Sequence, residues 1–224
     1  MKGTLMNRIR TNLLAVAVLA AGSLLASPAA AVQISELLYD AVGSDNGTLF
    51  VELWGVPGTS LEGWQIEGVN GADGAIGPIV ALSGEIPADG FFVVADSDAG
   101  TTLVANADLL ANFDFQNGPD SIVLRNALGE LLDSLGYGVF GAAEIFAGEG
   151  SPAPDGAPGQ SLARVYANVD SNDNAADFAL FDSPTPGSGA IALPEPVAVA
   201  PLLLFACGLG LARARHSRPP SAVG

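Results

Sequence analysis

The amino-acid sequence predicts an all-β domain, a β-sandwich of about eight or nine strands, flanked by two hydrophobic chain ends. Between residues 32 and 188, short apolar runs alternate with clusters of Gly, Pro, Asn and Asp. No apolar segment there keeps a 3.6-residue period over three turns, which argues against long helices. A region of this length fits one domain with a single hydrophobic core. Strands at this spacing are typical of two packed antiparallel sheets.

Each predicted strand is an apolar run bounded by residues that form turns. Four separators, SDNG, NGADG, PADG and NGPD, contain residues that accept positive φ or preset φ. The segment 107–113 is predicted to form one helical turn, and the Pro/Gly-rich segment 148–160 an exposed loop. The predicted strands are 33–39, 48–55, 63–68, 76–82, 91–96, 121–126, 131–137, 161–166 and, as a ninth, 178–181.

Residues 1–31 have the pattern of a secretory signal peptide. Lys2, Arg8 and Arg10 precede the apolar block LLAVAVLAAGSLLA, and small residues in ASPAAA follow it. Cleavage after Ala31 would start the mature protein at Val32.

The C-terminal end of the chain contains a second hydrophobic segment, which Pro-Glu-Pro precedes and arginines follow. A linker, 189–196, ends in Pro-Glu-Pro, and the sixteen apolar residues 197–212 follow it. As a helix they would span about 24 Å, just enough to cross roughly 30 Å of hydrocarbon. The arginines of the tail 213–224 would stay in the cytoplasm by the positive-inside rule. The sequence therefore predicts a transmembrane helix that leaves the domain outside.

The two ends together resemble the PEP-CTERM sorting system. In that system a signal peptide exports the protein, and an exosortase-type transpeptidase cuts the Pro-Glu-Pro, helix and arginine tail. The resemblance implies signal peptidase and such an enzyme as partners. It also implies membrane contact through the C-terminal helix before processing, and then a cell-surface or extracellular location. The remainder HSRPPSAVG is longer than in typical signals, and a permanently anchored ectodomain is the alternative. The matching residues are Pro194, Glu195, Pro196, Arg213 and Arg215.

The domain between these ends is strongly acidic. It contains 23 acidic side chains and only two basic ones, Arg125 and Arg164, which gives a net charge of −21. A phosphate backbone would be repelled at long range, so we expect no nucleic-acid partner. Divalent cations, an extracellular polysaccharide or a surface protein remain as partners. The charge could also serve solubility alone.

The composition also restricts catalysis. The only cysteine, Cys207, and the only histidine, His216, lie in the tail, so the domain has no disulfide, no Ser/His/Asp or Cys/His centre and no His/Cys zinc site. We therefore expect no enzymatic activity. The alternative is a hydrolase of extracellular polysaccharide that works with two carboxylates.

The order of motifs in the domain resembles bacterial lamin tail domains, which are immunoglobulin-like β-sandwiches. The motifs are ISELLYD, LFVELWG, LEGWQIEG, NGPDSIVLRNALGELLDSLGYG and SLARVYANVDSNDNAADFALFDSPTPGS, spread over 34–188. The resemblance implies a binding or structural module. In LEGW, Leu61 and Trp64 can bury large apolar surface, with Trp64 expected in the centre of the core and Gly63 at a tight strand entry. Residues 126–129 are expected to close a hairpin. WGVPGTS departs from the pattern of relatives.

One acidic stretch, DSNDNAAD, is a candidate calcium site because it concentrates the hard oxygen ligands that Ca²⁺ prefers. An EF-hand is excluded, since Ala175 replaces the turn glycine and Phe181 replaces the bidentate Glu. A looser calcium loop and an Asx-rich turn both remain open. Asp96 and Asp98 are a second, weaker candidate, and no other cofactor is expected. The candidate ligands are Asp170, Asn172, Asp173 and Asp177.

Overall fold

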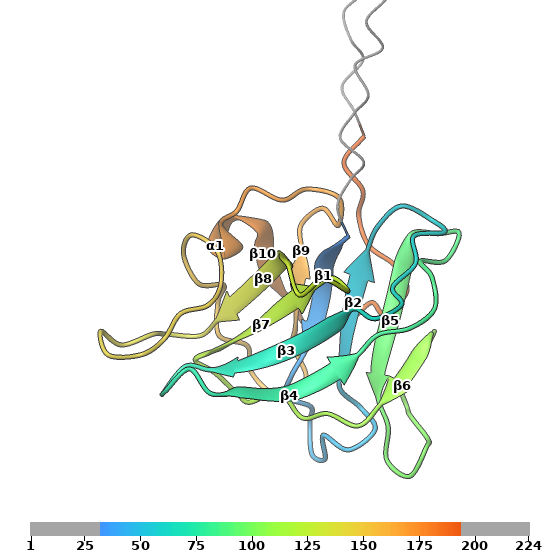
Figure 1. The fold of residues 1–224 in the computed structure, drawn as a ribbon. Coiled ribbons are helices and arrows are strands. Elements are labelled where there is room, and N and C mark those ends of the chain that lie inside the picture. The colour runs from blue at the N-terminus through green and yellow to red at the C-terminus, as the bar shows by residue number, and fades with distance from the viewer. Residues whose placement is uncertain (1–31, 194–224) are drawn as a thin grey trace, which may run out of the picture.

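A computed structural model describes residues 32–193 of the chain, and it confirms the prediction of an all-β fold with two packed sheets (Figure 1). The predicted signal peptide, the motif Pro194–Pro196, the apolar segment 197–212 and the basic tail 213–224 lie outside these residues. Within 32–193, no helix has the length and apolar character needed to cross a membrane.

The larger sheet has six strands in the order β10-β9-β1-β2-β5-β6, and the smaller has four in the order β4-β3-β7-β8. Neighbouring strands are antiparallel, except that β5 and β6 are parallel. A four-residue helix, α1, precedes the last strand. The elements are β1 (Gln33–Leu38), β2 (Phe50–Trp54), β3 (Gln65–Asn70), β4 (Ile76–Ala81), β5 (Phe91–Asp96), β6 (Leu109–Ala111), β7 (Asp120–Arg125), β8 (Leu131–Tyr137), β9 (Ser161–Arg164), α1 (Asn174–Asp177) and β10 (Phe178–Phe181).

One hydrophobic core lies between the two sheets. Alternating residues of each strand point inward, as the period of two in a β-strand requires. Tyr39 and Tyr137 stack with their ring centroids 4.4 Å apart and connect the two sheets at one end. Fully buried core residues include Ile34, Leu37, Leu53, Val94, Leu61, Ile66, Ile122, Leu124 and Leu135.

The predicted helical turn at 107–113 is wrong, because this segment contains strand β6. Asp108 fixes it to β5: its backbone N–H donates to the carbonyl of Val93 at 2.9 Å, and its side chain accepts from the N–H of Val93 at 2.8 Å. Farther along, Asp96 accepts a hydrogen bond from the N–H of Phe113 at 3.0 Å. These bonds hold the segment extended along the free edge of β5, and they override the local helical preference.

In the smaller sheet the structure confirms the predicted hairpin and corrects the predicted position of Trp64. The hairpin at 126–129 is confirmed: Gly129 has φ 77° and donates to the carbonyl of Asn126 at 2.9 Å. Gly63 has φ 76°, as expected for the tight entry to β3. Trp64, however, is only half-buried at the margin of the core. Leu61 is the fully buried residue of the LEGW motif.

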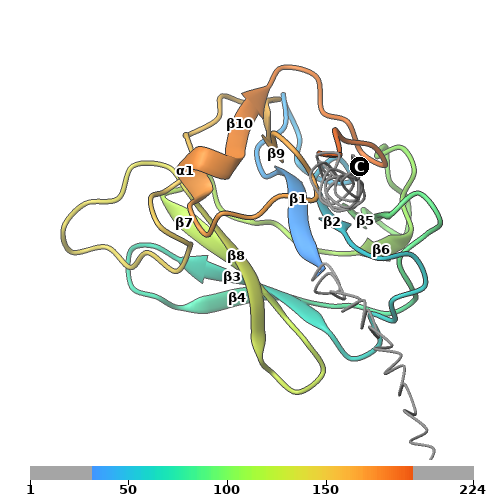
Figure 2. The same cartoon turned by 90° about the horizontal axis from the view of Figure 1, so that it is seen from above.

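The chain continues to contact the domain after its last strand. We call residues 185–192 the strap; they run back from β10 toward β2 and β5 (Figure 2). Ala167 donates to the carbonyl of Ala190 at 2.7 Å, and Asn168 exchanges two hydrogen bonds with Ala192. Both ends of the described chain leave the same end of the sandwich (Figure 1).

Candidate functional site

The region of the candidate calcium loop is organised around Arg164, at the end of β9. Its guanidinium is fully buried, with a side-chain exposure of 0%. Its Nε donates to the carbonyl of Ile34 at 2.7 Å, and Nη2 donates to both oxygens of Asp133 at 3.1 and 3.0 Å. Nη1 donates to Asp177 at 2.8 Å and to the carbonyl of Val169 at 3.2 Å. A guanidinium therefore occupies the centre of this acidic region.

Asp133, on β8, is the most deeply buried acid of this cluster. Besides the Arg164 contacts, it accepts hydrogen bonds from the backbone N–H of Ile34 at 2.6 Å and of Ser134 at 2.8 Å. Burial raises the pKa of Asp133, although the charge of Arg164 lowers it. The bidentate pair joins β8 of the smaller sheet to β9 of the larger one, and so connects the two layers.

Three of the four candidate calcium ligands, Asp170, Asp173 and Asp177, already accept hydrogen bonds from other groups of the chain. Asp177 accepts from Arg164 and from the N–H and hydroxyl of Ser171. Asp173 is the N-cap of α1: its side chain accepts from Ala175 N–H at 3.2 Å and from Ser151 N–H at 3.0 Å. Asp170 accepts from Asn172 N–H at 3.0 Å and lies 3.4 Å from Arg164. Asn172 itself has φ 56°, in the left-handed region.

Among residues 32–193, the acidic side chains that come together with metal-like spacing are Asp133, Glu149 and Asp170, whose oxygens lie within 4.8 Å of one another. Only Asp170 belongs to the predicted set. One oxygen of Glu149 is buried without a hydrogen-bond partner. Burial, together with the charges of Asp133 and Asp170, raises the pKa of Glu149 to about 7. The charge of the Glu149 carboxyl therefore depends on pH near neutrality.

Asn174, at the start of α1, holds the loop that carries Glu149. Its Oδ1 accepts from the N–H groups of Gly136 and Glu149, both at 2.9 Å, and its Nδ2 donates to the carbonyl of Ser134 at 2.9 Å. The side chain is completely buried. The sequence shows Asn174 only as one oxygen-bearing residue of the DSNDNAAD stretch, because its partners on β8 lie about 40 residues earlier.

The geometry of this cluster favours structural stabilisation over chemistry. Arg164 and Asp133 are closed off from solvent, so a substrate cannot reach them. In this cluster the guanidinium of Arg164 provides the positive charge that a calcium loop would take from a bound ion. Asp96, the second calcium candidate, likewise has both oxygens engaged, by Gly47 N–H at 2.6 Å and Phe113 N–H at 3.0 Å.

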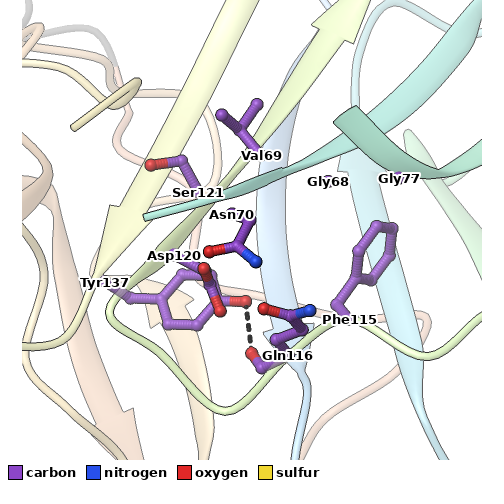
Figure 3. Close-up of a pocket in the computed structure, with 9 residues that line it drawn as sticks. All are labelled: Gly68, Val69, Asn70, Gly77, Phe115, Gln116, Asp120, Ser121 and Tyr137. Carbon is purple, nitrogen blue, oxygen red and sulfur yellow. Dashed lines mark hydrogen bonds between the residues drawn. The ribbon is translucent and has the colours of Figure 1, made fainter. Parts of the chain in front are cut away.

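A small cavity lies at one end of the sandwich, between β3, β7 and the loop before β7 (Figure 3). Figure 3 shows Tyr137 donating to the carbonyl of Gln116, at 2.8 Å, beside Asp120. Asp120 accepts from Gly71 N–H at 2.6 Å, and burial raises its pKa. The cavity volume of about 10 Å³ has room for one water molecule and for no larger ligand.

A larger, open groove of about 360 Å³ lies beside the strap. Asp89 and Asp108 line it together with Phe91, Asn106 and Gly187. Each acid already accepts a backbone hydrogen bond, from Phe91 and Val93 respectively. Burial raises the pKa of Asp108, and the charge of Asp89 contributes. The groove has the size for a small polar ligand, such as one or two sugar units.

Comparison with known proteins does not extend these observations. No model of a known protein family matches the chain, and no curated protein matches it. The resemblances to lamin tail domains and to PEP-CTERM signals therefore stay predictions from the sequence.

Proposed function

We propose that the protein is an exported, non-catalytic binding or structural module of the cell surface or extracellular matrix. Its domain would be an immunoglobulin-like sandwich of the lamin-tail type, sorted by a PEP-CTERM-like signal. The observation that carries the proposal is the layout of the chain: a signal-peptide pattern precedes the domain, and Pro-Glu-Pro, an apolar segment and arginines follow it. The domain between them is a cysteine-free two-sheet fold.

The exit of both chain ends from one end of the sandwich supports a tethered module. A chain held at its C-terminal side would present the opposite end, with the β1–β2 and β5–β6 loops, away from the tether (Figure 1). Binding at such loops is common because a rigid scaffold positions them. With a net charge of −21, the domain suits a basic protein, or a polysaccharide that is neutral or bridged by cations.

A carboxylate-based hydrolase is the second candidate, and the groove at Asp89 and Asp108 is the observation that favours it. Such an enzyme would release reducing ends from extracellular polysaccharide, and Asp108→Asn would abolish the release. Absence of any release by the wild-type protein would exclude this candidate for the polysaccharide tested.

Mass spectrometry of the intact protein, recovered from inner membrane and surface fractions, tests the main proposal. We expect the surface form to begin at Val32 and to lack Arg213 and Arg215. Replacement Glu195→Gln should trap the unprocessed form in the inner membrane, whereas Glu130→Gln, an exposed change in the domain, should not. A surface form that still carries both arginines would contradict processing and favour a permanently anchored ectodomain.

A further inference from the structure

Two carboxylates lie buried beneath the strap. Glu36 on β1 and Glu52 on β2 are partners in the strand register, and each is 1% exposed. Both line a cavity of about 60 Å³ between the larger sheet and the strap. Like charges directly opposite each other on neighbouring strands are destabilising, and burial increases the cost.

The strap supplies hydrogen-bond donors to both carboxylates. Thr185 donates through its N–H at 2.9 Å and its hydroxyl at 2.7 Å to Glu36. The N–H of Gly187 donates to Glu52 at 2.6 Å. From the sheet, Ser161 donates to Glu36 at 2.5 Å and Ser35 donates to Glu52 at 2.6 Å. These contacts make the strap the lid of the carboxylate pair.

No cation of the described residues neutralises this pair. Arg125 bonds Glu67 on the smaller sheet. Arg164 lines the same cavity, but its ion pairs go to Asp133, Asp170 and Asp177.

The other elements packed against the pair add no positive charge either. On β5, Val93 lies opposite Glu52, and the nearby acid is Asp108, which accepts from Val93. The strap itself has no ionisable side chain, and Asp182 before it accepts from Gln160. Burial of Glu52 beside a second carboxylate, with no cation to neutralise it, favours its protonated form.

We propose that the strap is a proton-dependent latch, which closes over the larger sheet when the Glu52 carboxyl beside Glu36 carries a proton and opens when Glu52 is ionised. The donors of Thr185 and Gly187 would hold the closed form. In the open form, water would solvate the two carboxylates. The proposal concerns residues 32–193 only and does not depend on the sorting signal.

The direction of the pH dependence follows from proton binding in the two forms. Burial, with a contribution from the charge of Glu36, raises the pKa of Glu52 to about 7 when the strap is closed. In the open form Glu52 would return toward the ordinary value of 4.5. The closed form therefore binds more protons between these values, so acid favours closure and the stabilisation is lost as pH rises through 7. Between pH 5.5 and 8.5 the closing constant should fall about 30-fold.

Opening would change how the domain is held. The strap is the last described segment before Pro194, and its eight residues could extend to roughly 28 Å when released. The latch would therefore switch the domain between a short and a long connection to the segment that follows it.

Hydrogen–deuterium exchange of the full chain in detergent micelles tests the latch. Strap peptides are compared with β7 peptides at pH 5.5, 7.0 and 8.5, after correction for intrinsic exchange rates. We expect strap protection to fall about 30-fold across this range while β7 protection stays constant. Glu52→Gln keeps the shape of the side chain and removes its charge, so strap protection should become independent of pH. Glu62→Gln, an exposed change, should behave as wild type.

Three results would overturn the proposal. The first is wild-type strap protection that does not change with pH, a result that needs no variant. The second is a loss of β7 protection in parallel with the strap, because this would indicate unfolding of the whole domain. The third is a Glu52→Gln variant with the same pH dependence as the wild type.

Discussion

Replacement of Arg164 by Met should be among the most destabilising changes in the domain. Met fills similar volume but removes the buried charge and leaves Asp133 and Asp177 without their cation. It also removes the hydrogen bonds to the carbonyls of Ile34 and Val169, and the contact of the guanidinium over the Phe178 ring at 4.6 Å. Loss of one partner of a buried ion pair costs about 3–5 kcal/mol. A domain of this size has a total stability of about 5–15 kcal/mol, so much of it would be lost.

The only other arginine of the domain provides a matched control. Arg125 bonds Glu67 at 2.9 Å, but 31% of its side chain is exposed. The Glu67 side chain is only 11% exposed, so this pair lies between an exposed pair, which contributes about 0–1 kcal/mol, and a fully buried one. Arg125→Met should therefore cost clearly less than Arg164→Met. Urea unfolding can be followed by tryptophan fluorescence, because Trp54 and Trp64 are the only tryptophans of the chain and both lie in the domain.

The comparison between the two arginine variants decides the interpretation. Equal losses of unfolding free energy in Arg164→Met and Arg125→Met would refute the conclusion that Arg164 compensates buried acids. Adding Asp133→Asn to Arg164→Met should restore part of the lost stability, because it removes one uncompensated charge. A double variant that is less stable than Arg164→Met alone would point to a role of Asp133 beyond this pair.

Three further predictions concern the core and the candidate ligands. Leu61→Ala should lower the free energy of unfolding by about 2–5 kcal/mol, and Trp64→Ala by roughly half as much, since Trp64 is half-buried. A larger loss for Trp64→Ala in thermal unfolding would contradict the central position of Leu61 in the core. Asn174→Ala removes three hydrogen bonds, two of them buried, and should lower the free energy of unfolding in urea by about 2–4 kcal/mol; a loss below about 0.5 kcal/mol would contradict its positioning role. A calcium site would raise the melting temperature with Ca²⁺ more than with Mg²⁺ and lose this difference in Asp170→Ala with Asp173→Ala. Equal shifts of the melting temperature with Ca²⁺ and Mg²⁺, in both the wild type and the double variant, would indicate charge screening without a calcium site.

The sequence was sufficient to predict most of the sheet strands, because their signals are local. Short apolar runs between turn formers mark strands such as β5 and β8, and Gly129 marks the hairpin turn. Strand β6 was missed since its extended shape depends on Asp108, which bonds Val93 fifteen residues earlier. The local sequence of 107–113 contains no trace of that contact.

The candidate site was predicted less well for the same reason. The stretch DSNDNAAD shows its oxygen ligands, but nothing near it shows that Arg164 will occupy the centre of the cluster. Asp133 and Glu149 reach the cluster from β8 and the following loop, through the folding of the two sheets onto each other. The charge count is the one sequence signal that points to Arg164, because the domain has only two basic side chains to compensate 23 acidic ones.

The place of β1 between β2 and β9 determines when the domain can complete its folding. β1 is the first strand of the chain, yet its hydrogen-bond partners come late in the sequence. The Ile34 carbonyl accepts a hydrogen bond from Arg164, 130 residues later, and Glu36 accepts one from Thr185, 149 residues later. Contacts at such separations slow folding, because the chain between them must be ordered first. Until β9 has been synthesised, one edge of β1 in the nascent chain has no partner strand. The domain should therefore complete its folding only after β9 and the strap have been synthesised.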